Sequence, residues 1–215
     1  MLIRKAILVS MVIFIFPLSA ACGVKSVGLA SGNLATADVC GMGVGFLGLG
    51  VGVGDEATAV FGMFTYGFSD YTEGRLKFGF SDADVPSSDP VILFGFDFKY
   101  EFMDYYDMMR QNPFDLAFGA FMEYVDYEGA SVFEGGVNTI GSIPYSFQSG
   151  RKLVPYLRLN LRLEKYSGNG DSESNFRFGA NVGTKFEVSS EFNAYGEFQL
   201  DGNIGFYLGA EIRVF

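Results

Sequence analysis

Histidine and tryptophan are absent from this sequence of 215 residues, which also has only two cysteines and six prolines. Histidine is the commonest general base in enzymes and the commonest protein ligand of transition metals. Its absence excludes every catalytic mechanism and metal site that depends on an imidazole ring. The sequence therefore predicts no enzymatic activity, no cofactor and no bound metal.

Basic residues are also scarce. The chain has 15 lysines and arginines against 25 aspartates and glutamates, which gives a net charge of −10. A protein that binds nucleic acid needs a basic excess to neutralise phosphates. We therefore expect no nucleic-acid partner.

The sequence has no apolar run long enough for a membrane-spanning helix. The longest run, from Ala6 to Leu18, has 13 residues, whereas about 18 or more are needed. Arg4 and Lys5 precede it and three small residues, 19–21, follow it, which is the order of elements in a secretory signal peptide. We predict that residues 1–21 are removed on export.

The two cysteines, Cys22 and Cys40, follow this signal. An oxidising compartment would allow them to form a disulfide that closes a short N-terminal loop. Lipid attachment at Cys22 is the alternative, although lipoprotein signals usually carry an aliphatic residue three positions before the cysteine, where this chain has Ser19. The sequence leaves both alternatives open.

Glycine and aromatic residues are abundant, with 29 Gly, 24 Phe and 12 Tyr. After a lead of small residues, apolar and polar residues alternate in ten segments separated by turns rich in Gly, Ser, Asp and Asn. This is the pattern of β-strands, and no helical periodicity occurs after the signal. The predicted strands are 42–53, 58–68, 73–81, 91–102, 114–124, 131–142, 153–166, 175–186, 191–200 and 203–215.

Each of these strands has an apolar face and a polar face. In 153–166 every second residue from Leu157 to Leu163 is leucine, and the residues between and after them are Arg158, Asn160, Arg162 and Glu164. The apolar faces are about ten residues long and often end in Tyr or Phe, as is typical of strands that cross a bilayer. We predict that the leucines face lipid and the polar residues face the interior of a closed barrel. A soluble secreted β-sandwich is the alternative.

The predicted interior faces carry eight basic and eight acidic residues. The basic residues are Arg75, Lys77, Lys99, Arg158, Arg162, Arg177, Lys185 and Arg213. The acidic residues are Asp97, Glu101, Asp115, Glu123, Glu134, Glu164, Glu197 and Glu211. Because opposite charges can pair across a lumen, we predict a structural charge network there. Acid–base catalysis by two of these carboxylates is a less favoured reading.

The chain resembles the small outer-membrane β-barrel proteins of diderm bacteria. The resemblance covers residues 42–215 and rests on the export signal, the alternation, the short turns and the terminal Phe215. It implies an all-β fold, an antiparallel up-and-down transmembrane β-barrel of about ten strands, with eight or twelve as alternatives. It also implies a location in the bacterial outer membrane, with outer-membrane lipid and the barrel-assembly machinery as partners.

The end of the chain departs from that family's usual pattern. Members usually end in an aromatic residue in phase with the apolar face, whereas Phe215 shares its phase with Arg213 and Glu211. The domains we expect are the signal peptide 1–21, a lead segment 22–41 and the barrel 42–215. The glycine-rich start of the barrel suggests that bulky side chains, or residues 23–40 acting as a partial plug, lie opposite it.

Three functions follow from this architecture. The first is a structural or general envelope role for a barrel whose interior is blocked by paired charges. A narrow, porin-like channel for small solutes is the first alternative, and a surface adhesion or interaction protein is the second. The sequence names no solute, no surface partner and no oligomeric state.

Overall fold

The computed structural model describes residues 34–54, 57–83, 90–104, 114–127, 130–168, 171–200 and 204–215. The predicted signal peptide, Cys22 and the proposed disulfide or lipid at that cysteine lie outside these residues. Within the described part of the chain, no helix has the length and apolar character needed to cross a membrane.

Ten long strands and one short strand make up the structure. Each of the ten segments predicted from the alternation corresponds to one long strand, and the two-residue β7 is an addition within the connection that leads to β8. The strands are β1 (Gly45–Gly54), β2 (Ala57–Ser69), β3 (Thr72–Ala83), β4 (Val91–Met103), β5 (Asp115–Tyr127), β6 (Ala130–Ser142), β7 (Tyr145–Ser146), β8 (Lys152–Gly168), β9 (Asp171–Glu187), β10 (Phe192–Leu200) and β11 (Ile204–Arg213).

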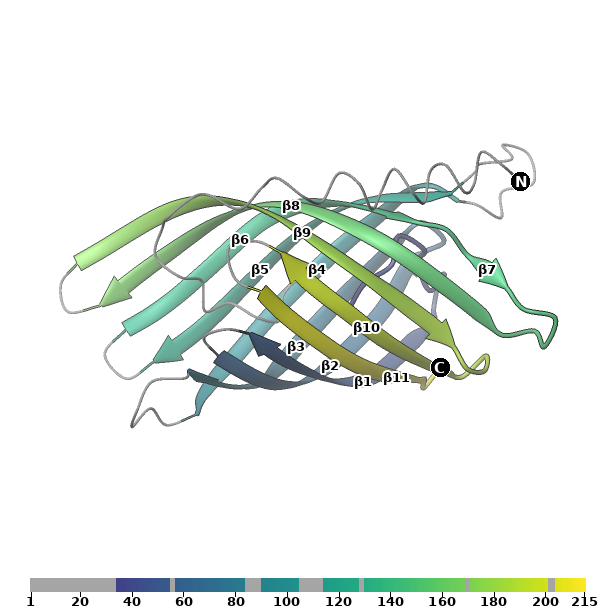
Figure 1. Ribbon diagram of the computed structural model, residues 1–215, viewed down its shortest axis with the longest axis horizontal. Coiled ribbons are helices and arrows are strands. Elements are labelled where there is room, and N and C mark those ends of the chain that lie inside the picture. Colours follow the sequence, from purple (N-terminus) through teal and green to yellow (C-terminus); the bar gives the residue numbers. More distant parts are fainter. Residues whose placement is uncertain are drawn as a thin grey trace.

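The ten long strands close into a barrel (Figure 1). Each pairs antiparallel with the next along the chain, β6 pairs with β8 across the short β7, and β1 pairs with β11. This confirms the predicted ten-stranded up-and-down barrel and excludes the alternatives of eight or twelve strands. We refer to the end of the barrel at which β11 finishes as the terminal end.

The barrel is apolar outside and polar inside. On its outer surface Leu161 and Phe176 are 50% and 78% exposed, whereas Arg158 and Glu164 on the inner surface are 2% and 0% exposed. A soluble β-sandwich would bury its leucines and expose its arginines, which is the reverse arrangement. The soluble alternative is therefore wrong, and the outer surface suits contact with hydrocarbon.

The terminal Phe215 reaches the outer surface despite its phase. Its ring lies 6.2 Å from that of Phe64 and 6.0 Å from that of Tyr66, which are neighbours on the outer side of β2. The ring passes directly over Gly45, where any Cβ would overlap it. Because β11 has ended at Arg213, strict alternation no longer fixes where Phe215 points, and its ring lies on the outer side although the residue shares its phase with Arg213.

Candidate functional site

The inner wall of the barrel is the candidate site, because the buried charged residues of the described part of the chain lie there. Of the sixteen residues in the predicted charge network, fourteen are buried. Arg177 is partly buried and Arg213 is exposed. Arg213 is the last residue of β11, and its Nε donates to the Phe215 carbonyl at 3.4 Å, so it lies at the rim of the barrel rather than inside.

Several of these charges form close pairs within the lumen. Glu164 accepts hydrogen bonds from Arg162 and Arg177, each at 2.7 Å, and its side chain is fully buried. Those two arginines stand directly opposite each other on β8 and β9. Lys77 lies 3.1 Å from Asp97 on the neighbouring strand. The pairs Arg177–Glu164 and Lys77–Asp97 connect neighbouring strands on the inner face of the barrel.

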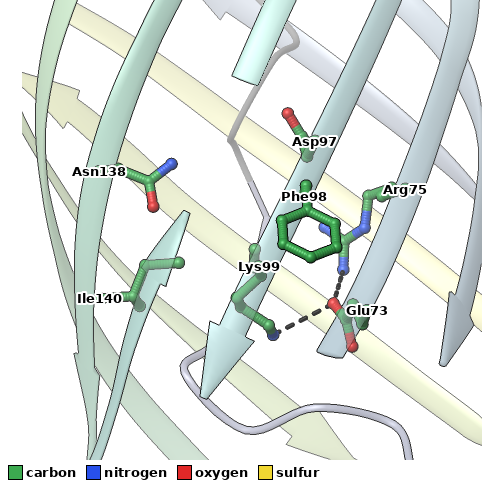
Figure 2. A pocket seen from close by; sticks show the side chains of 8 residues that line it. Glu73, Arg75, Asp97, Phe98, Lys99, Asn138 and Ile140 are labelled. Carbon is green, nitrogen blue, oxygen red and sulfur yellow. Dashed lines mark ion pairs between the residues drawn. The ribbon is translucent and has the colours of Figure 1, made fainter. Parts of the chain in front are cut away.

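Glu73 belongs to the same network, although the sequence analysis did not include it. Its Oε1 lies 3.1 Å from Lys99 Nζ and 3.6 Å from an Arg75 amino group (Figure 2). The signal was present, since Glu73 is in phase with Arg75 and Lys77 at the start of the predicted strand 73–81.

Residues 34–41 run inside the barrel rather than along its surface. This segment is the described part of the predicted lead segment 22–41, and we call it the lead from here on. It leads into β1 at the terminal end and is the purple trace within the barrel in Figure 1. Four of its backbone N–H groups donate to side chains of the wall. These bonds are Leu34 to Glu197 (2.8 Å), Ala37 to Ser142 (3.3 Å), Val39 to Glu101 (3.2 Å) and Cys40 to Glu73 (3.0 Å).

Wall cations bind the carbonyl groups of the lead. An Arg75 amino group donates to the Leu34 carbonyl at 2.6 Å, and Lys99 Nζ donates to the carbonyls of Thr36 and Asp38, each at 2.7 Å. An extended chain inside a barrel has no sheet partner, so its backbone groups need such acceptors and donors to offset the loss of water. The inner charges therefore pair with one another and also bind the lead.

Apolar contacts complete this packing. Leu34 is fully buried, and a Cβ added to Gly209 would lie 2.6 Å from its Cδ1. On β1 itself, a Cβ added to Gly50 would lie 2.5 Å from the Phe61 ring, and one added to Gly52 would lie 2.5 Å from the Tyr207 ring. The glycines thus leave room for bulky groups opposite, as the composition of β1 suggested. Aromatic side chains fill the space opposite the glycines of β1, whereas Leu34 of the lead packs against Gly209 of β11.

Beside the lead remains a small pocket, drawn in Figure 2. Ala35 of the lead and wall residues Glu73, Arg75, Asp97, Lys99 and Asn138 line it. Asn138 Oδ1 is buried and accepts no hydrogen bond from the described residues. Phe98 and Ile140 complete the lining, so the pocket is small and largely apolar with a few polar groups, which suits one or a few water molecules and not a large solute.

Solved outer-membrane barrels share this fold. The β domain of the Bordetella autotransporter BrkA matches with 11% identity and a TM-score of 0.50, over 80% of this chain and 100% of that chain. This chain is a small β-barrel of the outer-membrane type. The KdgM porin matches the barrel with 11% identity and a TM-score of 0.37, over 78% of this chain and 98% of the porin.

A third match is Ail, the attachment invasion locus protein of Yersinia pestis. It has 16% identity to the barrel and a TM-score of 0.34, over 79% of this chain and 99% of Ail. At such identities the likeness concerns the fold alone. No protein-family model matches the chain, and no curated protein does.

Cys40 provides a test of the position of the lead. Burial, together with the nearby Glu73 carboxylate, raises the pKa of its thiol from 9.0 to about 12. Only the thiolate reacts, and its fraction at pH 8 falls about tenfold for each unit by which the pKa rises, so maleimide should label Cys40 about a thousandfold more slowly than an exposed thiol. The labelling rate should keep rising up to about pH 12, whereas that of an exposed thiol levels off near pH 9.

The labelling measurement needs Cys40 as the only thiol. The folded Cys22→Ser variant provides this, and the same variant unfolded in urea gives the reference rate for a solvent-exposed Cys40. Equal rates in the folded and unfolded samples at pH 8 would show that the lead lies outside the barrel.

Proposed function

We propose that this protein is a structural component of the bacterial outer membrane, a closed barrel with an envelope role and no enzymatic activity. The observation that carries the proposal is the bound lead. Six wall side chains, from β3, β4, β6 and β10, hold its backbone inside the lumen. A barrel that fills its own interior in this way has little room for a solute path.

The barrel's expected partners fit this role. Its outer surface is apolar and would be covered by outer-membrane lipid, and the barrel-assembly machinery would insert it. A ten-stranded barrel is only slightly wider than the eight-stranded kind, whose interior is just filled by side chains. The buried charges and the lead both occupy that limited space.

A narrow channel is the second candidate. It is supported by polar atoms that are buried beyond the lead without a hydrogen-bond partner among the described residues, namely Asn138 Oδ1 and Asn160 Oδ1. Such atoms usually bind water. A file of water molecules past these asparagines would allow small ions to pass if the lead moved aside.

Planar-bilayer recordings would separate the two functions. We expect the mature protein to show almost no steady conductance, and a variant lacking residues 23–40 to show frequent open events and to unfold at a lower temperature. The reason is that the deletion removes Leu34 to Cys40 from the lumen, so that Arg75, Lys99 and Glu73 lose the backbone groups of the lead that they bind. The matched control lacks only residues 23–33 and should behave like the mature protein.

Two results would count against the structural role. Steady conductance of the mature protein would favour the channel. Unchanged conductance and heat stability after deletion of 23–40 would mean that the lead does not close the barrel.

A further inference from the structure

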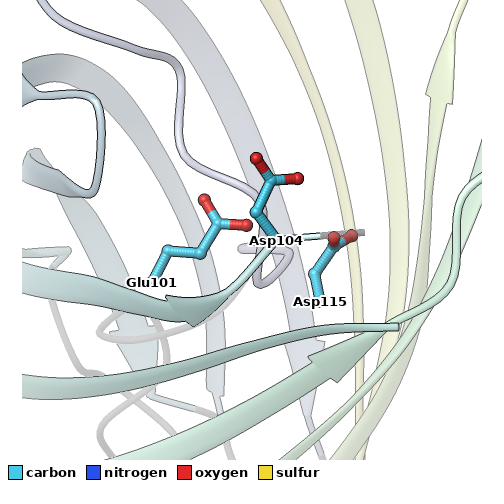
Figure 3. A group of neighbouring side chains, drawn as sticks. All are labelled: Glu101, Asp104 and Asp115. Atoms are coloured by element: carbon cyan, nitrogen blue, oxygen red, sulfur yellow. The ribbon is translucent and has the colours of Figure 1, made fainter. Parts of the chain in front are cut away.

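Three carboxylates converge at the terminal end of the barrel. Glu101 and Asp104 stand where β4 ends, and Asp115 stands where β5 begins (Figure 3). One oxygen from each lies within 4.8 Å of the other two, and Glu101 and Asp115 are buried. Like charges this close repel strongly in a site that water reaches poorly.

A β-bulge brings these three residues together. Glu101 is opposite Ala117, but Met103 is opposite Leu116, so β4 contains one extra residue between these pairs. With strict alternation, the Asp104 side chain would point to the opposite face of the sheet from that of Glu101. Because of the extra residue, it points to the same face as Glu101 and lies level with Asp115. Bulges often re-aim a side chain in this way next to functional sites.

A second observation points to a ligand at this cluster. Glu101 is 3% exposed; its Oε2 accepts the Val39 N–H at 3.2 Å, while its buried Oε1 has no hydrogen-bond partner among the described residues. A buried carboxylate oxygen is costly unless a hydrogen bond or a cation satisfies it. Figure 3 shows the three side chains side by side, and one oxygen of each lies within 4.8 Å of the other two, so a cation placed between them would contact all three carboxylates.

Lys99, the lysine nearest to Glu101 in the sequence, binds other groups. An ammonium group has three N–H donors. Lys99 Nζ uses its contacts on the carbonyls of Thr36 and Asp38 and on Glu73, at 2.7, 2.7 and 3.1 Å. Lys99 therefore binds the lead and Glu73, further from the terminal end of the barrel than the three carboxylates.

We propose that Glu101, Asp104 and Asp115 bind a divalent cation, and that Ca²⁺ fits best. Calcium takes carboxylate oxygens at about 2.3–2.6 Å in a flexible geometry, so oxygens up to about twice that distance apart can share one ion. Magnesium needs bonds of about 2.0–2.1 Å and a near-ideal octahedron. A spread of up to 4.8 Å therefore suits the larger ion.

The site would also fasten the lead. Val39 contacts Glu101 directly, and Ala37 contacts Asp115 through Ser142, whose hydroxyl lies 3.3 Å from both the Ala37 nitrogen and Asp115 Oδ2. A cation held there would join the ends of β4 and β5 beneath the point where the lead passes. The absence of histidine led to the expectation of no metal, and the bulge that unites these acids leaves no spacing motif in the sequence that would have indicated one.

The test is calcium titration of the mature protein, refolded in detergent micelles and freed of metal with EDTA. Isothermal titration should show one saturable Ca²⁺ site per chain, binding Mg²⁺ at least tenfold more weakly, and the unfolding temperature should rise with Ca²⁺ concentration. Glu101→Gln keeps an acceptor for Val39 and should weaken Ca²⁺ binding at least tenfold. Asp104→Asn, at a less buried position, should do the same without a risk of misfolding.

Glu191→Gln is the matched control, since Glu191 is an exposed acid in the turn before β10 at the same end of the barrel. It should bind Ca²⁺ like the parent. The proposal is overturned if the parent shows no saturable binding heat up to about 10 mM calcium, about tenfold above the dissociation constants of the weakest natural calcium modules. It is equally overturned if Glu101→Gln and Asp104→Asn bind as tightly as Glu191→Gln, because the ions would then be held by other acids.

Discussion

Replacing Leu161 by arginine should destabilise the membrane-inserted barrel by about 2–4 kcal/mol, the cost of a guanidinium that faces lipid near the bilayer midplane. Leu161 lies near the middle of β8 and is 50% exposed on the outer surface. The neighbouring residues on the adjacent strands, Val137 and Phe178, are also apolar and exposed. An arginine there would find no acidic group on the surface around it.

Urea unfolding in lipid vesicles measures this free energy. Ser174→Arg is the matched control, because Ser174 is exposed on β9 close to the loop that joins β8 and β9. Near the interface the same side chain should cost less than about 1 kcal/mol. If the two variants lose equal stability, the exposed leucines do not face the hydrocarbon.

Replacing Glu164 by leucine should lower the free energy of unfolding by an amount comparable to that of Leu161→Arg. The physical cause is the opposite one, because here an apolar side chain replaces a charge inside the barrel. Removing one member of a buried ionic group typically costs about 3–5 kcal/mol, because the remaining charges stay buried without it. Here the guanidinium groups of Arg162 and Arg177 would remain next to each other without the carboxylate that joins them. Glu164→Leu should therefore lower the free energy of unfolding although it makes the protein more apolar.

A second substitution identifies the origin of that loss. Adding Arg177→Leu to Glu164→Leu removes one of the two cations and should restore part of the stability, so the two substitutions should not be additive. Glu173→Gln, an exposed acid on the same hairpin, should leave the free energy of unfolding within about 0.5 kcal/mol of the parent. Additive losses from Glu164→Leu and Arg177→Leu would mean that the two residues act independently.

Much of the wall was predictable from the sequence, because a β-strand alternates its side chains strictly. In β8 the leucines alternate with Arg158, Asn160, Arg162 and Glu164 over a long stretch. One strand of this kind fits a soluble sheet as well. Ten of them without a covering helix require closure, and closure determines which face is inside.

The parts that could not be predicted are those where alternation ends or does not apply. The glycines of β1 suggested a partial plug, but the lead has no pattern of its own that predicts its contacts, which are made by groups such as Glu197 and Lys99 far along the chain. The bulge after Glu101 reverses the direction of the Asp104 side chain, and no glycine or proline in this stretch of the sequence indicates a bulge. Phe215 lies beyond the end of its strand, where packing against Phe64 and Tyr66 decides its position.

The bound lead has a consequence for the order in which the barrel assembles. Its contacts are on β3, β4, β6 and β10, and the bond from Leu34 to Glu197 joins residues 163 positions apart. Contacts over such separations form late in folding because of the entropy of closing the intervening loop. A chain halted before β10 joins the wall would lack the acceptor for Leu34. Insertion of the lead into the lumen is thus a late step of assembly that requires the last strands to be in place. Slow labelling of Cys40 by maleimide would identify chains that have completed this step.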